Sequence, residues 1–409
     1  MTKLRTVING MRLIGILLII STMLGCSSDF FPIKREIDQI EMVQLMTIDK
    51  CNETGLVEVA VVNKTGMETG GGEGASQENE RINVLSGIGE TAYEAVRNLK
   101  AHSDKVVFFS HLEYFIIGES AAKENFGKYF DIISRDPELR FTSKIYIAKE
   151  CMAKDLVHVT LAQDKYIVDR LKNMEDDERV LGRNSEVSII EVIQMLNTPN
   201  IATVIPALRR SEIQEEISTE YLPFYDLATA GYAILKDFQL HDYIEESSAR
   251  GYNFVVNKVK STPISVKDHT GEYVALDLVG AETKVKGHFK GKKLTGVTFE
   301  TYVQSNIGEQ HSRVNLITKE RLAEIKEKQE KIITEEMEKV IKFSQEIGTD
   351  CIELGKRLRM RYPFKWDHIE NEWEKIFPEI DIKVKVIAKI NRTYEINKPS
   401  GYELEQYEK

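Results

Sequence analysis

The alternation of hydrophobic and polar residues predicts strands early in the chain. Residues 42–48 and 56–62 alternate as a half-buried strand requires, and residues 49–55 between them are rich in turn formers. The two segments therefore predict a β-hairpin with its turn at 49–55. Further strand-like runs follow at 106–109, 112–117 and 141–148.

Helical periodicity is interleaved with these strands. Ala92, Ala95, Val96 and Leu99 lie at the spacing i, i+3, i+4 and i+7, which is typical of one apolar helix face. Similar periodicity predicts helices near 126–133 and over 165–196. Because helices and strands intermingle, we expect a mixed α/β region over residues 35–210, long enough for two subdomains.

The second half of the chain follows a different pattern. Residues 211–225 are polar and are expected to be a connector. Beyond them, a long apolar stripe predicts a helix over 318–347, and the strand-like runs lie at 253–256, 273–279, 283–289, 296–303 and 380–390. We expect a C-terminal α+β domain at 226–397, an antiparallel sheet with one long helix, and a polar tail at 398–409. The fold class is thus α+β with several subdomains.

A second apolar stripe lies near the C-terminus. Trp366, Ile369, Trp373 and Ile376 recur at spacings of three and four residues, which predicts an amphipathic helix with both indoles on one face. We expect this stripe to be buried against the C-terminal sheet. A surface that rests on a membrane is the alternative.

The N-terminus has the layout of a secretory signal peptide. Basic residues precede an apolar run that begins at Leu13 and is shorter than the roughly 20 residues that a membrane-spanning helix needs. Met23-Leu24-Gly25-Cys26 is typical of a lipobox, in which the chain is cut before a lipid-modified cysteine. We therefore expect a signal peptide at 1–25, lipidation of Cys26 and a tether at 26–34. An ordinary signal peptide with an incidental cysteine is the alternative.

Charge narrows the range of partners. The 409 residues carry a formal net charge of −10, and cleavage before Cys26 would remove Lys3, Arg5 and Arg12. This acidic balance disfavours nucleic acid and a polybasic hold on anionic lipid, so the membrane link falls to the lipid on Cys26. With 42% hydrophobic residues the chain can build a packed core.

Motifs for catalysis or metal binding are missing from the sequence. It contains no His-Glu-x-x-His, Gly-x-Ser-x-Gly or Cys-x-x-Cys, and its eight histidines have no close metal-ligand spacing. His111, beside a strand, is interpreted as a buried polar residue, with a ligand as the alternative. Cys51, Cys151 and Cys351 are expected to be buried thiols, with one disulfide as the alternative. We expect no catalytic residue, no metal and no cofactor.

One charged segment is a candidate contact site. In Arg135-Asp136-Pro137-Glu138-Leu139-Arg140 the proline disfavours helix at the preceding residue, which predicts a helix end and a turn. A functional interpretation makes the side chains of Arg135, Asp136, Glu138 and Arg140 a partner surface. The alternative is that they only mark the end of a helix.

Short segments spread along the chain together carry a family pattern. In chain order they are Gly25-Cys26, Arg35-Glu36-Ile37-Asp38, Thr47-Ile48-Asp49-Lys50, His111-Leu112, the 135–140 segment, Tyr362-Pro363 with Trp366 and Trp373, and the run 383–390. In this order the segments resemble the Ger(x)C family, the lipoprotein subunits of nutrient germinant receptors in endospore-forming bacteria. Two features depart from the family pattern, namely Ser27-Ser28 where Trp-Asp is frequent and Ser110 where glycine is frequent.

The resemblance implies a non-enzymatic α+β protein tethered by lipid to the outer face of the cytoplasmic (inner spore) membrane. It would act with A-type and B-type receptor subunits, in assembly or signal relay. Whether it contacts a small-molecule germinant stays open. The alternative function is that of a substrate-binding lipoprotein associated with a transporter, which predicts two similar α/β lobes.

Overall fold

A computed structural model of the chain describes residues 14, 36, 39–65, 81–163, 165–213 and 224–391. The expected signal peptide apart from residue 14, Cys26 with its tether, the middle of the expected connector and the polar tail lie outside these residues. The chain divides into a small unit, residues 1–41 with 104–107, and a large unit that holds the rest. A two-stranded sheet pairs β1 (Ile40–Met42) with β5 (Val106–Phe108).

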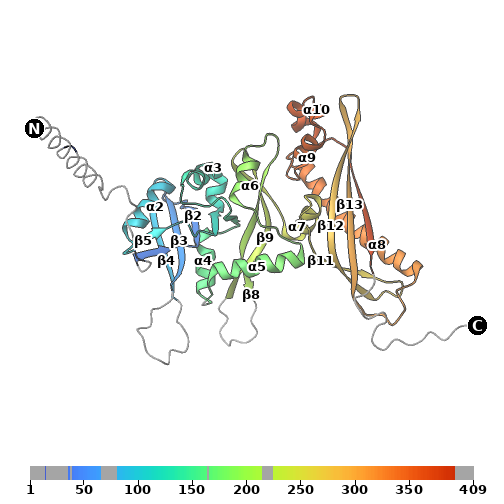
Figure 1. Cartoon of the computed structure of the whole chain (residues 1–409), viewed down its shortest axis with the longest axis horizontal. Coiled ribbons are helices and arrows are strands. Elements are labelled where there is room, and N and C mark those ends of the chain that lie inside the picture. Colours follow the sequence, from blue (N-terminus) through green and yellow to red (C-terminus); the bar gives the residue numbers. More distant parts are fainter. Residues whose placement is uncertain are drawn as a thin grey trace, which may run out of the picture. The chain divides into compact units, whose positions relative to one another are not determined.

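An eight-stranded mixed sheet organises the first half of the large unit (Figure 1). Its strand order is β10-β9-β8-β7-β6-β2-β3-β4, and the contacts β2–β6, β6–β7 and β7–β8 are parallel. Leu45 lies opposite Val62 in an antiparallel pair, which confirms the predicted hairpin. The strands are β2 (Leu45–Lys50), β3 (Val57–Thr65), β4 (Arg81–Gly89), β6 (Tyr114–Gly118), β7 (Lys144–Ala148), β8 (Thr203–Ile213), β9 (Phe224–Lys236) and β10 (Gln239–Ile244).

Helices cover both faces of this sheet, which is why all five residues of β6 are buried. On one face Ile116 and Tyr146 pack with Leu156 and Leu171 from helices α4 (Ala153–Leu161) and α5 (Ile167–Leu181). Helices α2 (Ala92–Ala101) and α3 (Glu119–Arg135) pack on the other. Helix α6 (Ile189–Leu196) contacts β8. The segment expected to be helical over 165–196 thus forms two separate helices, α5 and α6.

The expected connector is partly strand. β8 and β9 pair from Thr203 opposite Leu235 out to Ile213 opposite Phe224, so both ends of 211–225 belong to one long hairpin. Strands β9 and β10, assigned from sequence to the C-terminal domain, complete the eight-stranded sheet. The prediction of a connector rested on the polar residues of this segment. The end of a hairpin is exposed to solvent, so its residues are polar even where they still belong to a strand.

The C-terminal sheet has four strands in the order β11-β12-β13-β14. Its bounds are β11 (Thr262–Lys267), β12 (Tyr273–Lys290), β13 (Lys293–Gln310) and β14 (Ile382–Ile390). The first three strands are antiparallel as expected, whereas β14 is parallel to β13. The long helix α8 (Lys319–Glu346) carries the chain back along the sheet between these two strands, and such a crossover produces a parallel pair. The segments 273–279 and 283–289, expected to be two strands, are one strand with register shifts near Gly280.

Helix α8 confirms the predicted long helix. The Thr318 hydroxyl accepts a hydrogen bond from the N–H of Arg321 and caps its start. Ile325, Ile333 and Met337 are buried against the sheet, along which α8 runs in Figure 1. The opposite face of the sheet carries exposed residues, among them Lys284, Tyr302 and Lys385.

Two predictions about this half were wrong in their secondary structure. Residues 253–256, expected to be strand, form the end of helix α7 (Glu246–Val255) and its cap. The stripe from Trp366 to Ile376 is three short turns instead of one helix. They are α10 (Pro363–Trp366), the 3-10 turn η3 (Glu370–Glu372) and α11 (Trp373–Ile376), preceded by α9 (Leu354–Arg361).

The burial predicted for this stripe is nevertheless confirmed. Trp366 and Trp373 are 3% and 1% exposed, and their ring centroids lie 5.1 Å apart. Both belong to the core that includes the four-stranded sheet and α8. The spacing of the apolar residues therefore predicted which side chains are buried, but not the helix that holds them.

Candidate functional site

The charged segment 135–140 forms the predicted helix end and turn. Helix α3 ends at Arg135, and Asp136 is extended, as the following proline favours. The Asp136 carboxylate accepts a hydrogen bond of 2.9 Å from the N–H of Glu138, and Leu139 is buried. The turn is thus fixed by its own backbone and by one apolar side chain.

The structure separates the four candidate contact residues. The Nε of Arg135 donates to Asp131 over 2.6 Å, an i,i+4 pair whose side chains are both mostly exposed. Glu138 is exposed on the turn, and Asp136 is occupied in capping it. Arg140 alone among the four lines a surface depression with residues from other elements.

This depression has a volume of about 420 Å³ and lies at the amino-terminal ends of β6 and β7. It brings together two of the segments that carry the family resemblance, because His111 and Arg140 both line it. His111 is exposed, so its interpretation as a buried residue was wrong. The acidic and basic side chains in the lining are those of His111, Glu113, Arg140, Lys144, Lys172 and Glu175.

Ion pairs and hydrogen bonds order the lining. Lys172 lies 2.8 Å from Glu113, and the Ser143 hydroxyl donates to the Leu112 carbonyl over 2.6 Å. Burial raises the pKa of Glu175, whose carboxylate accepts a hydrogen bond from Tyr146. No pattern in the sequence indicated Lys172 or Glu175 as site residues, because only the tertiary fold brings α5 to this depression. With both signs of charge, the depression suits a complementary charged protein segment.

The other end of the central strands is filled by the buried carboxylate of Asp49. Open α/β sheets bind ligands at the carboxyl ends of their strands, often at a helix N-terminus. Here Asp49 accepts hydrogen bonds from the N–H groups of Ala153 (2.6 Å) and Lys154 (2.9 Å), at the start of α4. The position that an anionic ligand would take is thus occupied by the protein's own side chain. Asp49, which was predicted to lie in the turn of the hairpin, lies within β2.

The Asp49 carboxylate is buried and closely packed against its neighbours. Its pKa is raised to about 6, chiefly by burial, although the two backbone N–H groups act in the opposite direction. Next to it, a Cβ on Gly118 would lie only 2.0 Å from the Asp49 Oδ1 atom. Glycine is therefore the residue that this end of β6 can accommodate.

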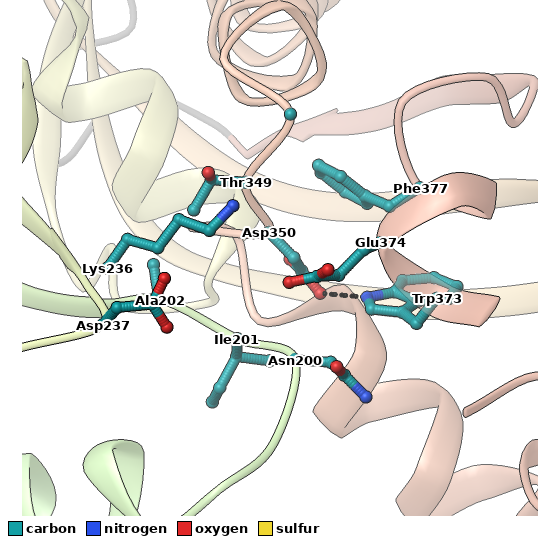
Figure 2. Close-up of a pocket in the computed structure, with 11 residues that line it drawn as sticks. Asn200, Ile201, Ala202, Lys236, Asp237, Thr349, Asp350, Trp373, Glu374 and Phe377 are labelled. Atoms are coloured by element: carbon teal, nitrogen blue, oxygen red, sulfur yellow. Dashed lines mark hydrogen bonds between the residues drawn. The ribbon is translucent and has the colours of Figure 1, made fainter. Parts of the chain in front are cut away.

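A small cavity of about 80 Å³ lies beside a second buried carboxylate, that of Asp350 (Figure 2). Asp350 accepts hydrogen bonds from the N–H groups of Leu354 (3.0 Å) and Gly355 (2.7 Å) at the start of α9, and from the indole of Trp373 (3.1 Å). Burial raises its pKa to about 6. Figure 2 shows Lys236 reaching toward Thr349 across this cavity.

The surroundings of this cavity join segments that are far apart in sequence. The N–H of Ala202 donates to the Asp350 carbonyl over 3.0 Å, and the Asn200 amide donates to the Glu370 carbonyl over 3.0 Å. Typical small-molecule pockets are several times larger, at about 300–1,000 Å³. We therefore interpret the cavity as a gap in the packing between three segments, and not as a ligand site. These are the segment that follows α6, the segment before α9, and α11.

The three cysteines that the structure describes are free thiols. Cys351 is buried, and burial raises its pKa to about 12, whereas Cys51 and Cys151 are only partly buried. The expectation of buried thiols thus holds for one of the three, and none of them forms a disulfide. Within the described ranges, His, Cys, Asp and Glu do not gather in groups of three or more that could hold a metal ion. The described helices include none that is long and apolar enough to cross a membrane.

Comparison with known proteins covers most of the chain. Residues 34–210 match the family model described as spore germination protein N-terminal domain, and residues 230–394 match the model described as spore germination B3/GerAC like, C-terminal. Spore germination protein KC of Bacillus subtilis (strain 168) is 24% identical over 95% of this chain and 97% of its own length. Spore germination protein B3 of the same organism is 21% identical over 87% and 92%.

A solved structure shares the fold. The crystal structure of the GerBC protein superposes with a TM-score of 0.52, covering 84% of this chain and 96% of that one, at 16% identity. At such low identity the likeness concerns the fold alone. It agrees with the α+β class predicted from the sequence.

Proposed function

We propose, on the premise that this chain belongs to the GerAC family of spore germination proteins, that it is the lipid-anchored C-type subunit of a nutrient germinant receptor. The observation that carries this proposal is the pair of family matches, which together span residues 34–210 and 230–394. In this role the protein assembles with A-type and B-type membrane subunits at the outer face of the cytoplasmic (inner spore) membrane.

Lipid on Cys26 provides the anchor in this proposal. Its support is the sequence before it, a basic start, a short apolar run and Met23-Leu24-Gly25-Cys26. Two acyl chains suffice for stable membrane attachment, because each buried methylene contributes about 0.8 kcal/mol. The anchor would keep the described domains at the membrane surface, where membrane-embedded subunits are within reach.

Contact, rather than catalysis, is the proposed mode of action. The depression lined by His111, Glu113, Arg140 and Lys172 offers charges of both signs. The hydroxyl of its serine, Ser143, donates to the Leu112 carbonyl and not to a general base, as a catalytic serine would. We assign it as the contact for another receptor subunit. Arg135, Asp136 and Glu138 on the adjoining turn are candidates for the edge of the same contact.

The alternative of a substrate-binding lipoprotein has less support. It predicts two similar α/β lobes around a ligand, whereas here an eight-stranded mixed sheet is followed by a four-stranded sheet of different order. The carboxyl ends of the central strands, moreover, are occupied by Asp49 and the start of α4.

Deletion of the gene tests the proposed function. Spores without the protein should lose their response to particular nutrients but still germinate with triggers that bypass receptors. A Cys26→Ala strain should lose the protein from the membrane fraction and respond slowly, while Cys51→Ala, a matched control outside the lipobox, should behave as the parent. A normal nutrient response in the deletion strain, with no paralogous receptor present, would refute the proposal.

A further inference from the structure

Positive charge is concentrated in two segments of this acidic chain. Residues 283–299 contain five lysines and no acidic residue, and residues 354–366 contain five lysines and arginines and no acidic residue. The whole chain nevertheless has a net charge of −10. A sum over the chain therefore conceals a strongly basic region.

The fold brings these two segments together. The first is the hairpin end where β12 turns into β13, and the second comprises α9 and α10, which Figure 1 shows at the same end of that sheet. The rings of Phe289 and Tyr362 meet edge to face at 5.3 Å, and the Nζ of Lys365 lies 4.4 Å from the Phe289 ring centroid. Arg361 donates a hydrogen bond of 3.0 Å to the Val285 carbonyl. We call the surface formed by Lys290, Lys292, Lys293, Arg359, Met360, Arg361, Phe364 and Lys365 the basic tip.

Two apolar side chains of the basic tip face solvent. Met360 is 69% exposed and Phe364 is 86% exposed, the largest exposed fractions among the large hydrophobic residues of the described chain. Arg359, Arg361 and Lys365 flank them and are also exposed. Exposed apolar residues bordered by cations are typical of segments that rest in the interface of a membrane.

The positive charge of the basic tip is not cancelled by its neighbours. Glu300 and Glu353 border it, but each already pairs with a lysine outside it, Lys286 at 2.6 Å and Lys356 at 2.8 Å. Among the described residues, Lys290, Lys292 and Lys293 make no ion pair. Asp367 follows α10 directly and is exposed. The basic tip thus keeps a surplus of cations for an external partner.

We propose that the basic tip binds the surface of an anionic lipid bilayer, with Phe364 and Met360 at the boundary between headgroups and acyl chains. The negative net charge of the whole chain disfavoured electrostatic binding to anionic lipid, but it does not oppose a contact made by the basic tip alone. Charges farther away than the Debye length of about 8 Å are largely screened at physiological salt, so the nearby lysines and arginines dominate. The contact goes beyond the proposed function, because it needs no lipid on Cys26.

A protein partner fits the basic tip less well. A stable protein interface covers about 800 Å² on each side around an apolar core. The apolar part here is two side chains on α9 and α10, surrounded by flexible cations. That composition matches a fluid, negatively charged surface better than a shaped one.

Vesicle binding tests the proposal. The probe protein is the mature chain from Ser27, which is the processed protein without its lipidated cysteine and keeps every described strand and helix. It should sediment with vesicles of equal parts phosphatidylglycerol and phosphatidylcholine, and not with phosphatidylcholine alone, and high salt should release it. The triple variant Lys290→Gln, Lys292→Gln and Lys293→Gln should bind about 100-fold more weakly, since each lysine near an anionic surface contributes about fivefold.

Matched variants show whether position matters. Lys331→Gln, Lys339→Gln and Lys342→Gln remove the same charge from the exposed side of α8 and should leave binding within about threefold of the parent. Phe364→Ser should weaken binding with all charges intact. Thermal unfolding of each variant checks that it is folded.

The proposal is overturned if the parent does not bind anionic vesicles, or if both lysine triples reduce binding equally. It is also overturned if the basic-tip triple binds vesicles normally but no longer co-purifies with an acidic protein, which would identify a protein partner instead. None of these three results would bear on the role of Cys26 or on the germination phenotype of the deletion.

Discussion

The indole N–H of Trp373 donates a hydrogen bond of 3.1 Å to the carboxylate of Asp350, and both side chains are buried. The same carboxylate accepts the N–H groups of Leu354 and Gly355 at the start of α9. A Cβ on Gly355 would lie 2.9 Å from Trp366 and 3.0 Å from Trp373. One buried acid therefore holds the start of α9 and the paired indoles in a single arrangement.

Removal of the indole donor should destabilise the protein. Trp373→Phe keeps an aromatic ring but removes one of the two donors to the Oδ2 atom of Asp350, so the free energy of unfolding should fall by about 1–3 kcal/mol. Trp373→Ala, and likewise Trp366→Ala, should cost about 3–5 kcal/mol because a large cavity is added. Urea unfolding measures both effects. A Trp373→Ala protein as stable as the parent would show that the stripe is not buried.

The buried acid at position 350 should make stability depend on pH. Its pKa is raised from 3.8 to about 6 in the folded protein, so the folded state holds the proton more tightly than the unfolded state. Its contribution is thus fully present below about pH 4 and is lost as the pH rises through about 6, a change of about 3 kcal/mol.

Asp350→Asn removes this titration and provides the comparison. The parent should exceed the variant in unfolding free energy by more at pH 4.5 than at pH 7, because only the parent loses the contribution of Asp350 over that range. Denaturant unfolding of both proteins at the two pH values measures the difference. An equal difference at both would contradict the raised pKa.

Space beside Asp49 gives a steric prediction. Gly118→Ala would place a methyl group 2.0 Å from the Asp49 carboxylate, so the unfolding free energy should fall by about 3 kcal/mol. Gly280→Ala is the matched control within β12, because nothing lies within 4 Å of its Cβ position. It should stay within about 0.5 kcal/mol of the parent. Equal losses in the two variants would mean that strand glycines, and not the contact with Asp49, set the effect.

Charge reversal at Arg135 should leave stability nearly unchanged. Its pair with Asp131 is exposed, and exposed i,i+4 pairs contribute little to the stability of a folded protein. Thermal unfolding of Arg135→Glu should therefore match the parent closely. If nutrient germination is slower in that strain, the cause is then the loss of a contact with a partner and not unfolding of the protein. A large drop in the melting temperature would contradict that interpretation.

The pattern of hydrophobic and polar residues predicted the elements that are determined by residues close together in the sequence. The hairpin that pairs Leu45 with Val62 and the helix capped by Thr318 both follow from residues close in sequence. Segment 253–256 was misread because it is buried on all sides within α7, and a short apolar run does not distinguish helix from strand. The parallel direction of β14 depends on the crossover through α8, which strand periodicity does not encode.

The buried acids could not be found from sequence alone. Asp49 contacts a helix start more than 100 residues away, and Asp350 contacts an indole 23 residues away, so only the tertiary fold reveals either carboxylate as a cap. The segment around Arg140 was detectable as a charged turn next to a proline. Its meeting with His111 and Lys172 depends on the order of strands in the sheet.

The central claim is that the protein acts by contact with other receptor subunits. Co-purification of membrane subunits with this protein tests that claim most directly. A tagged protein purified from spore membranes should bring A-type and B-type receptor subunits with it. Arg140→Glu should reduce that recovery severalfold, and Lys331→Glu, an exposed charge reversal on α8, should not. A tagged protein that supports normal nutrient germination, yet recovers neither subunit even after crosslinking, would contradict the account.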